Sequence, residues 1–162
     1  MHILFITRCF LTLVLASSVS FSLVVFAAED TEFCQVVRKV VAASSHDFQD
    51  VRNGDATVQE DNKYWLSTVK VSGGKTPRIW YYGADKQYAW VEYMLPPENP
   101  DVRKVFDFGK QSIRSCLGTD WSFRERVHGK SEELIATSAN KPTVVLSLDS
   151  NGLFLTISKD AE

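Results

Sequence analysis

The hydrophobic pattern of this chain passes twice from the spacing of a helix to that of β-strands. Residues 31–50 and 99–118 carry apolar side chains at the three-and-four spacing of an amphipathic helix. Each helical segment is followed by short stretches rich in β-branched and aromatic residues, and these stretches are separated by residues typical of turns. A helix followed by a series of strands, occurring twice, restricts the chain to the α+β class.

The first half of the chain predicts one helix and three strands. Residues 29–32 are rich in acids, which suits a helix N-terminus, and Asn53 with Gly54 is expected to end this helix. The polar stretch 53–62 is expected to be a loop. The short connections after it predict an antiparallel meander, with strands at 63–71, 78–83 and 87–95.

The second half predicts a second helix and four strands. Asn99 and Pro100 are typical of a helix start, and Gly118 is typical of a helix end. Strands are expected at 121–128, 134–139, 143–148 and 153–158. The element order is therefore α-βββ-α-ββββ. The economical fold is a two-layer sandwich with both helices on one face of an antiparallel sheet, although periodicity leaves open whether the strands form one sheet or two.

The N-terminal segment has the features of a secretory signal peptide. A weakly cationic start at residues 1–8 precedes an apolar run at residues 9–26, and the small residues Ala27 and Ala28 follow. We expect cleavage at about residue 28, export to the periplasm or outside the cell, and a single mature domain at residues 29–162. An uncleaved membrane anchor is the alternative, because the apolar run could just span a bilayer. No other stretch is apolar enough to cross a membrane.

Two cysteines, Cys34 and Cys116, remain after this cleavage. An exported chain meets an oxidising compartment, so a disulfide between them is the expected state. The alternative is a catalytic or redox thiol, but the chain has no C-x-x-C pair to support it.

Charge and motifs exclude several classes of function. The net charge is −2, and removing residues 1–28 takes away one Arg and no acid, so the mature chain has no basic footprint for nucleic acid or for an anionic membrane. No metal-binding, phosphate-binding or hydrolase motif occurs, so we expect no cofactor, no metal and no catalytic residue. His46 and His128 are expected at the surface. The acids near residues 47–61 are expected to be solvated, with calcium binding as a weak alternative.

Aromatic residues are concentrated in residues 64–93, which contain eight of them. Side chains alternate between the two faces of a strand, so helices that cover one face leave some of these rings on the other. Exposed Trp and Tyr are enriched at recognition sites. Our candidate binding residues are therefore Trp80, Tyr82, Tyr88 and Trp90. The alternative is that the rings form cross-strand pairs and fill the core.

These features favour an exported, non-catalytic binding or accessory protein, chaperone-like or inhibitor-like. It would engage a protein or peptide through an aromatic face or an edge of the sheet. The alternative is a small exported hydrolase whose site is assembled from scattered acids and a His. The sequence identifies neither the partner nor the oligomeric state.

Overall fold

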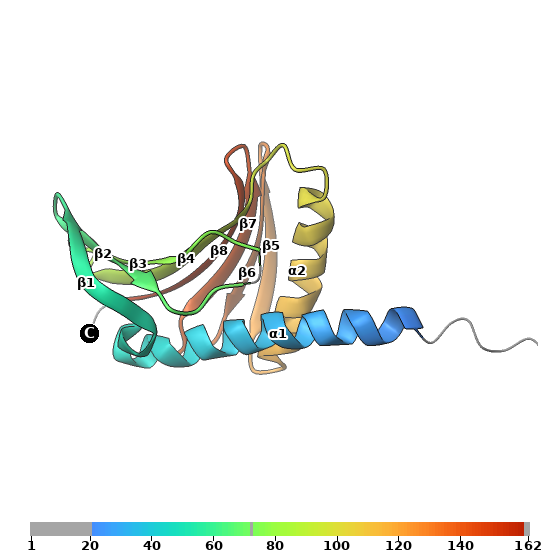
Figure 1. Ribbon diagram of the computed structural model, residues 1–162, viewed down its shortest axis with the longest axis horizontal. Helices are drawn as coiled ribbons and strands as arrows, with labels where there is room; N and C mark the ends of the chain where they lie inside the picture. The colour runs from blue at the N-terminus through green and yellow to red at the C-terminus, as the bar shows by residue number, and fades with distance from the viewer. Residues whose placement is uncertain (1–20, 72, 161–162) are drawn as a thin grey trace, which may run out of the picture.

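The computed structural model describes residues 21–71 and 73–160, and within these ranges it contains two α-helices and eight β-strands (Figure 1). The α+β class is therefore confirmed. The elements are α1 (Phe21–Ala43), β1 (Arg52–Gln59), β2 (Asn62–Ser67), β3 (Arg78–Tyr82), β4 (Gln87–Leu95), α2 (Val102–Leu117), β5 (Ser122–His128), β6 (Ser131–Thr137), β7 (Thr143–Asp149) and β8 (Gly152–Asp160).

All eight strands belong to one antiparallel sheet, in the order β1-β2-β3-β4-β8-β7-β6-β5. Each half of the chain forms a four-stranded meander, and the two meanders meet at the β4–β8 pair in the centre. These two strands, of nine residues each, pair from Gln87↔Asp160 to Leu95↔Leu153. The question of one sheet or two is settled in favour of one.

Strand β1 corrects the predicted element order, which becomes α-ββββ-α-ββββ. The prediction of a loop at residues 53–62 was wrong; it rested on their polarity and on the lack of an alternating apolar pattern. The structure places most of them in an edge strand that pairs only with β2, with an irregular register between Asn53 and Thr57. Most of β1 is exposed to solvent, so no buried face imposes an apolar alternation on its sequence.

The two predicted helices differ in how well their ends were placed. Helix α2 begins at Val102, after Asp101 rather than at the predicted Asn99, whereas its end at Leu117 and the positive φ of Gly118 (76°) agree with the prediction. Helix α1 begins at Phe21, before the acids at 29–32 that were predicted to start it, and it ends at Ala43, earlier than the predicted residue 50. Two short 3-10 turns follow, Ser44–His46 and Gln49–Val51, separated by Asp47 and Phe48 in left-handed conformations, and Phe48 is completely buried.

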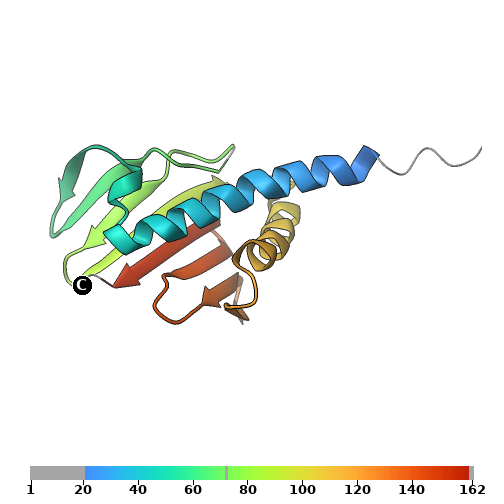
Figure 2. The ribbon, with the colours of Figure 1, turned by 90° about the horizontal axis from the view of Figure 1, so that it is seen from below.

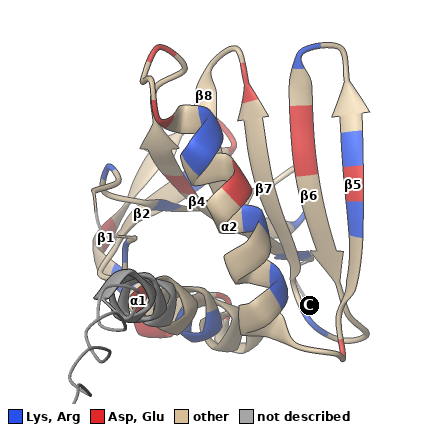
Figure 3. Cartoon of the chain, turned by 90° about the vertical axis from the view of Figure 1, so that its right-hand side faces the viewer, with Lys and Arg blue, Asp and Glu red and all other residues tan. Residues whose placement is uncertain are grey.

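Both helices lie on the same side of the sheet (Figures 1 and 3). Figure 1 shows the sheet bending between the β1–β2 hairpin and the β7–β8 hairpin, with the helices on the outside of the bend. A view from below shows α1 passing across the sheet (Figure 2). The core between the layers includes Phe48, Ile79, Trp90, Phe106, Ile113, Leu134, Leu146, Leu155 and Ile157.

The predicted disulfide is confirmed. Cys34 of α1 is bonded to Cys116 in the last turn of α2, with the two Cα atoms 5.1 Å apart. Figure 1 shows the C-terminal end of α2 meeting α1, the two helices that this bond joins. The Arg38 Nε also donates to the carbonyl oxygen of Cys116, at 2.9 Å.

The predicted signal peptide lies largely outside the described residues, because residues 1–20 are not described. Helix α1 continues through Ala27 and Ala28, where cleavage is expected. The division at residue 28 therefore stays a prediction. Among the described helices, none combines the length and the apolar character needed to span a bilayer.

Candidate functional site

One face of the sheet is left uncovered by the helices. Residues that pair directly across an antiparallel ladder project to the same face. Ile79, Trp90 and Ile157 are successive partners with no exposed surface, and they mark the face that the helices cover. The neighbouring partners Trp80 and Ala89 therefore belong to the opposite side, which we call the open face.

A cluster of three rings lies at the β2–β3 side of the open face. Trp80 and Tyr82 are two positions apart in β3, and their rings are stacked at 13° with centroids 6.0 Å apart. Tyr64, the register partner of Trp80, brings its ring to 4.9 Å from the indole. All three side chains are half-buried. The Arg78 guanidinium lies 4.8 Å from the Tyr64 ring centroid. We call Tyr64, Trp80 and Tyr82 the Trp80 cluster.

A second pair of rings belongs to the two central strands. Tyr93 of β4 and Phe154 of β8 are register partners, and their rings meet edge to face with centroids 5.1 Å apart. The ammonium of Lys75 lies 4.5 Å from the Tyr93 centroid. Both rings are half-buried.

A continuous row of side chains runs between these two groups of rings. Starting at Arg78, each member is the direct register partner of the next across six neighbouring strands. The two end residues are exposed, whereas those between them are half-buried and mainly aliphatic. In order, the row is Arg78, Val91, Thr156, Val145, Ile135 and Arg124.

Tyr82 and Tyr93 on this face have raised phenol pKa values, so both keep their protons at neutral pH. Burial raises the pKa of Tyr82, and burial together with the charge of Glu98 raises the pKa of Tyr93. A protonated phenol has both an O–H donor and an acceptor oxygen. The open face thus combines large, rigid apolar area with hydrogen-bonding groups.

The four predicted binding residues divide between the two faces. Trp80 and Tyr82 lie together on the open face. Tyr88 is half-buried on the helix-covered face, with its ring 4.9 Å from that of Tyr81. Trp90 is fully buried and donates from Nε1 to the Ser67 Oγ at 3.0 Å, so it offers no surface to a partner.

The connection between β3 and β4 explains this division. It pairs Tyr82 with Gln87, so even-numbered residues of β3 share a face with odd-numbered residues of β4. Tyr93 therefore joins the open face in place of Tyr88 and Trp90. Tyr64 and Tyr93 were not among the predicted binding residues, and Phe154 was missed because only the strand order brings β8 beside β4. The sequence does contain a signal for Phe154. Leu153, Leu155 and Ile157 alternate along the strand, and Phe154 is apolar at an intervening position where a polar residue would be expected.

His46 and His128 both lie at the surface, each near acidic side chains. His46 Nδ1 lies 3.1 Å from the Asp50 carboxylate in an exposed pair. His128 lines a shallow pocket of about 420 Å³ together with Arg126, Ser131 and Glu133. Among residues 32–159, no His, Cys, Asp or Glu side chains gather in a group able to hold a metal ion.

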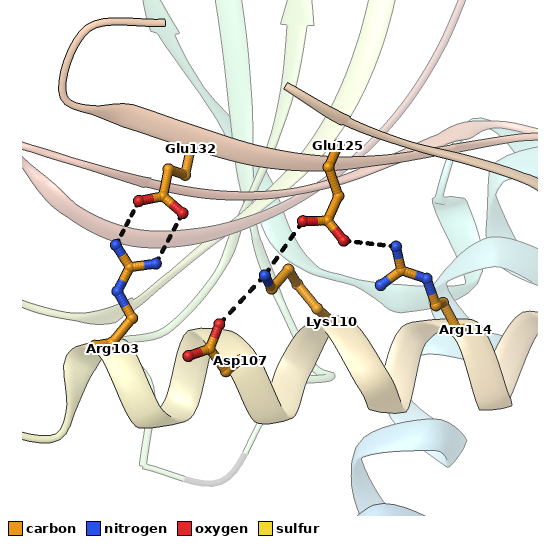
Figure 4. Close-up of polar contacts among 6 residues, drawn as sticks. All are labelled: Arg103, Asp107, Lys110, Arg114, Glu125 and Glu132. Carbon is orange, nitrogen blue, oxygen red and sulfur yellow. Dashed lines mark hydrogen bonds and ion pairs between the residues drawn. The ribbon is translucent and has the colours of Figure 1, made fainter. Parts of the chain in front are cut away.

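The densest group of charges joins α2 to the β5–β6 hairpin (Figure 4). Arg103 binds both carboxylate oxygens of Glu132, and Arg114 donates to Glu125 at 2.8 Å. Lys110 lies 3.3 Å from Glu125 and 3.2 Å from Asp107. These hydrogen bonds from Arg103 and Arg114 lower the pKa of Glu132 and of Glu125. Because these charges satisfy one another, we assign them to holding α2 in place.

The open face is therefore the candidate functional site. It carries two groups of half-buried rings and an aliphatic row between them, and neither helix covers it. Comparisons with protein-family models, with curated proteins and with solved structures found no match for this chain.

Proposed function

We propose that this chain is an exported, non-catalytic binding protein, chaperone-like or inhibitor-like, which engages a protein or peptide partner through the open face of its sheet. The observation that carries the proposal is the Trp80 cluster, which remains half-buried on a face that neither helix covers. Leaving contiguous rings in water is costly unless a partner covers them.

The chemistry of the face suits protein recognition. Trp and Tyr provide large contact area with few rotatable bonds, so little entropy is lost when a partner immobilises them. The rings stand on strands β2, β3, β4 and β8 of an eight-stranded sheet that a disulfide-linked helical layer supports. A rigid platform of this kind keeps the ordering cost of binding low.

The faces of the sheet are better suited to binding than its edges. Addition of a partner strand requires an accessible, regular edge. The edge strand β5 carries Arg124, Glu125 and Arg126 in succession, and the edge strand β1 has an irregular register (Figure 3). Charged and irregular edges oppose strand addition.

Export is the second part of the proposal. It is supported by the signal-peptide pattern of residues 1–28 and by the Cys34–Cys116 disulfide, because such bonds persist in oxidising compartments. Fractionation with N-terminal sequencing of the mature chain tests it. Recovery of the uncut chain from the cytoplasm with two reduced thiols would contradict it.

The binding role is tested by cross-linked capture from the native exported fraction. The test variant is Trp80→Ala with Tyr82→Ala, and the matched control is Val58→Ala with Val127→Ala, which trims two exposed apolar side chains on the other face. We expect wild type and control to capture the same protein and the test variant to lose it while remaining folded by circular dichroism.

Two results would reject the binding role. One is capture by the folded test variant at the wild-type level, and the other is the absence of any specific partner for the wild type. If the test variant unfolds, Thr156→Arg provides a second test, because a bulky cation in the aliphatic row obstructs docking while leaving the rings in place.

A further inference from the structure

We propose that the partner segment bound by the open face is acidic and carries aromatic or large aliphatic side chains among its acids. This inference rests on the proposed function and adds the chemistry of the partner. It is carried by the charges that surround the aliphatic row.

The charged groups at the centre of the open face are predominantly cationic. In the rows that contain Trp80, Val91 and Tyr93, the charged register residues are Arg78, Arg124, Arg126 and Glu133, and the Lys75 ammonium lies over the Tyr93 ring. The acid within these rows, Glu133, is paired with Arg126 at 3.7 Å, and outside the rows the charge of Glu98 also reaches the Tyr93 phenol. The whole chain, by contrast, has a net charge of −2.

Three of these cations lack a carboxylate partner among the residues that the structure describes. Within those residues, no carboxylate oxygen lies within 4.0 Å of Lys75, Arg78 or Arg124. Arg103 and Arg114 have acid partners, whereas Lys39 and Lys104 on the helices have none within 4.0 Å among the described residues. Partner carboxylates would therefore neutralise groups that folding leaves available.

The positions of the cations match an apolar segment flanked by acids. Arg78 and Arg124 flank the half-buried aliphatic stretch, five strand spacings apart, and beyond Arg78 the register continues to the exposed Leu66 of β2. At ~4.8 Å per spacing, this corresponds to roughly 24 Å along the row. Between them lie half-buried aliphatic side chains that a partner's apolar groups would cover.

The same features disfavour two other occupants. A second copy that docked face to face would oppose one cationic surface with another, and like charges across an interface are repulsive. A nucleic acid would place its closely spaced phosphates against an aliphatic row that lies between widely spaced cations.

Defined polymers test this chemistry directly and stand in for the partner segment. The probe is a random copolymer of glutamate and tyrosine, compared with polyglutamate and with an oligothymidylate of similar charge, by biolayer interferometry on the oxidised mature protein. We expect the copolymer to bind more tightly than either of the others, and increasing salt to weaken its binding.

Charge reversals assign the binding to a face. Arg78→Glu with Arg124→Glu should weaken copolymer binding by about tenfold or more. The control, Lys39→Glu with Lys104→Glu, changes the net charge equally at exposed positions of α1 and α2 and should retain wild-type binding. If the double variant does not fold, copolymer binding by the single variants Arg124→Glu and Lys104→Glu is compared instead, because Arg124 is exposed and its replacement should leave the fold intact.

Four outcomes would overturn the inference. They are no copolymer binding by the wild type, unchanged binding by the Arg78 and Arg124 variant, equal loss in the Lys39 and Lys104 control, and equally tight binding of oligothymidylate. The proposed function is judged separately by partner capture. If capture depends on Trp80 and Tyr82 but not on Arg78 and Arg124, the open face binds a partner of different chemistry.

Discussion

Cys34 in α1 and Cys116 at the end of α2 are covalently joined where the C-terminal end of α2 meets α1, 82 positions apart in the sequence. The bond links the two halves of the chain on the helical side, as the β4–β8 pairing does within the sheet. It therefore fixes the layer that supports the open face from behind.

Removal of the disulfide should lower stability while preserving the fold. Cys34→Ala with Cys116→Ala frees a closed loop of this length in the unfolded chain, which the chain-entropy account values at up to about 4–5 kcal/mol. Urea unfolding of the oxidised wild type and the variant measures the change. An unchanged midpoint, or alkylation of two free thiols in the exported wild type without reductant, would contradict it.

Stability should fall as pH rises from about 4.5 to 7, because of Glu92. This carboxyl has no exposed surface and accepts from the Val71 backbone N–H at 2.8 Å. Burial raises its pKa from 4.5 to about 7, against the opposing effects of the Val71 hydrogen bond and the charge of Lys70. In that pH window the unfolded state has released the proton and the folded state still holds it, so folding is favoured at the acidic end.

Glu92→Gln isolates this contribution, since the amide stays neutral and retains an acceptor for Val71. At pH 8 the variant should be more stable than wild type by up to about 3 kcal/mol, and at pH 4.5 the two should be similar. Chemical denaturation at both pH values measures the difference. Glu98→Gln, at an exposed position, serves as the control. Equal stability differences at both pH values would show that Glu92 does not titrate as described.

The two tryptophans Trp80 and Trp90 should respond differently to truncation. Trp90→Ala removes a completely buried ring and leaves the Ser67 hydroxyl without its indole donor, at an expected cost of about 3–5 kcal/mol. Trp80→Ala removes a half-buried ring from a cross-strand pair, at a cost of about 1 kcal/mol. Thermal melting distinguishes the two. Similar losses at both positions would mean that Trp80 is part of the core.

The ion pairs between α2 and the β5–β6 hairpin should contribute modestly. Glu125→Gln and Glu132→Gln should each cost less than ~1 kcal/mol at neutral pH, because these pairs are largely solvent-exposed and salt screens them. Because the pKa of each carboxyl is lowered in the folded state, their contribution should disappear as pH falls below about 4.5. A cost that persists in high salt would contradict this assignment. Glu60→Gln, in the exposed β1–β2 turn, is the control.

Local periodicity was sufficient to predict the helices and seven of the eight strands. Repeating patterns of side-chain burial fix these elements, as in α2, where Phe106, Ile113 and Cys116 are buried along one side. The two cysteines, together with the export pattern, were sufficient to predict the disulfide. Strand β1 escaped prediction because an exposed edge strand needs no apolar face.

Which aromatic rings share a face was decided only by the tertiary structure. Periodicity separates the two faces of one strand, but relating the faces of neighbouring strands requires their register. The pairing of Tyr82 with Gln87 placed Tyr93 on the same face as the Trp80 cluster and sent Trp90 into the core. The pairing of β4 with β8 brought Phe154 against Tyr93 and aligned Arg78 with Arg124 across the sheet. Long-range pairing arises from burial of the whole sheet beneath the helices, which no local stretch of sequence encodes.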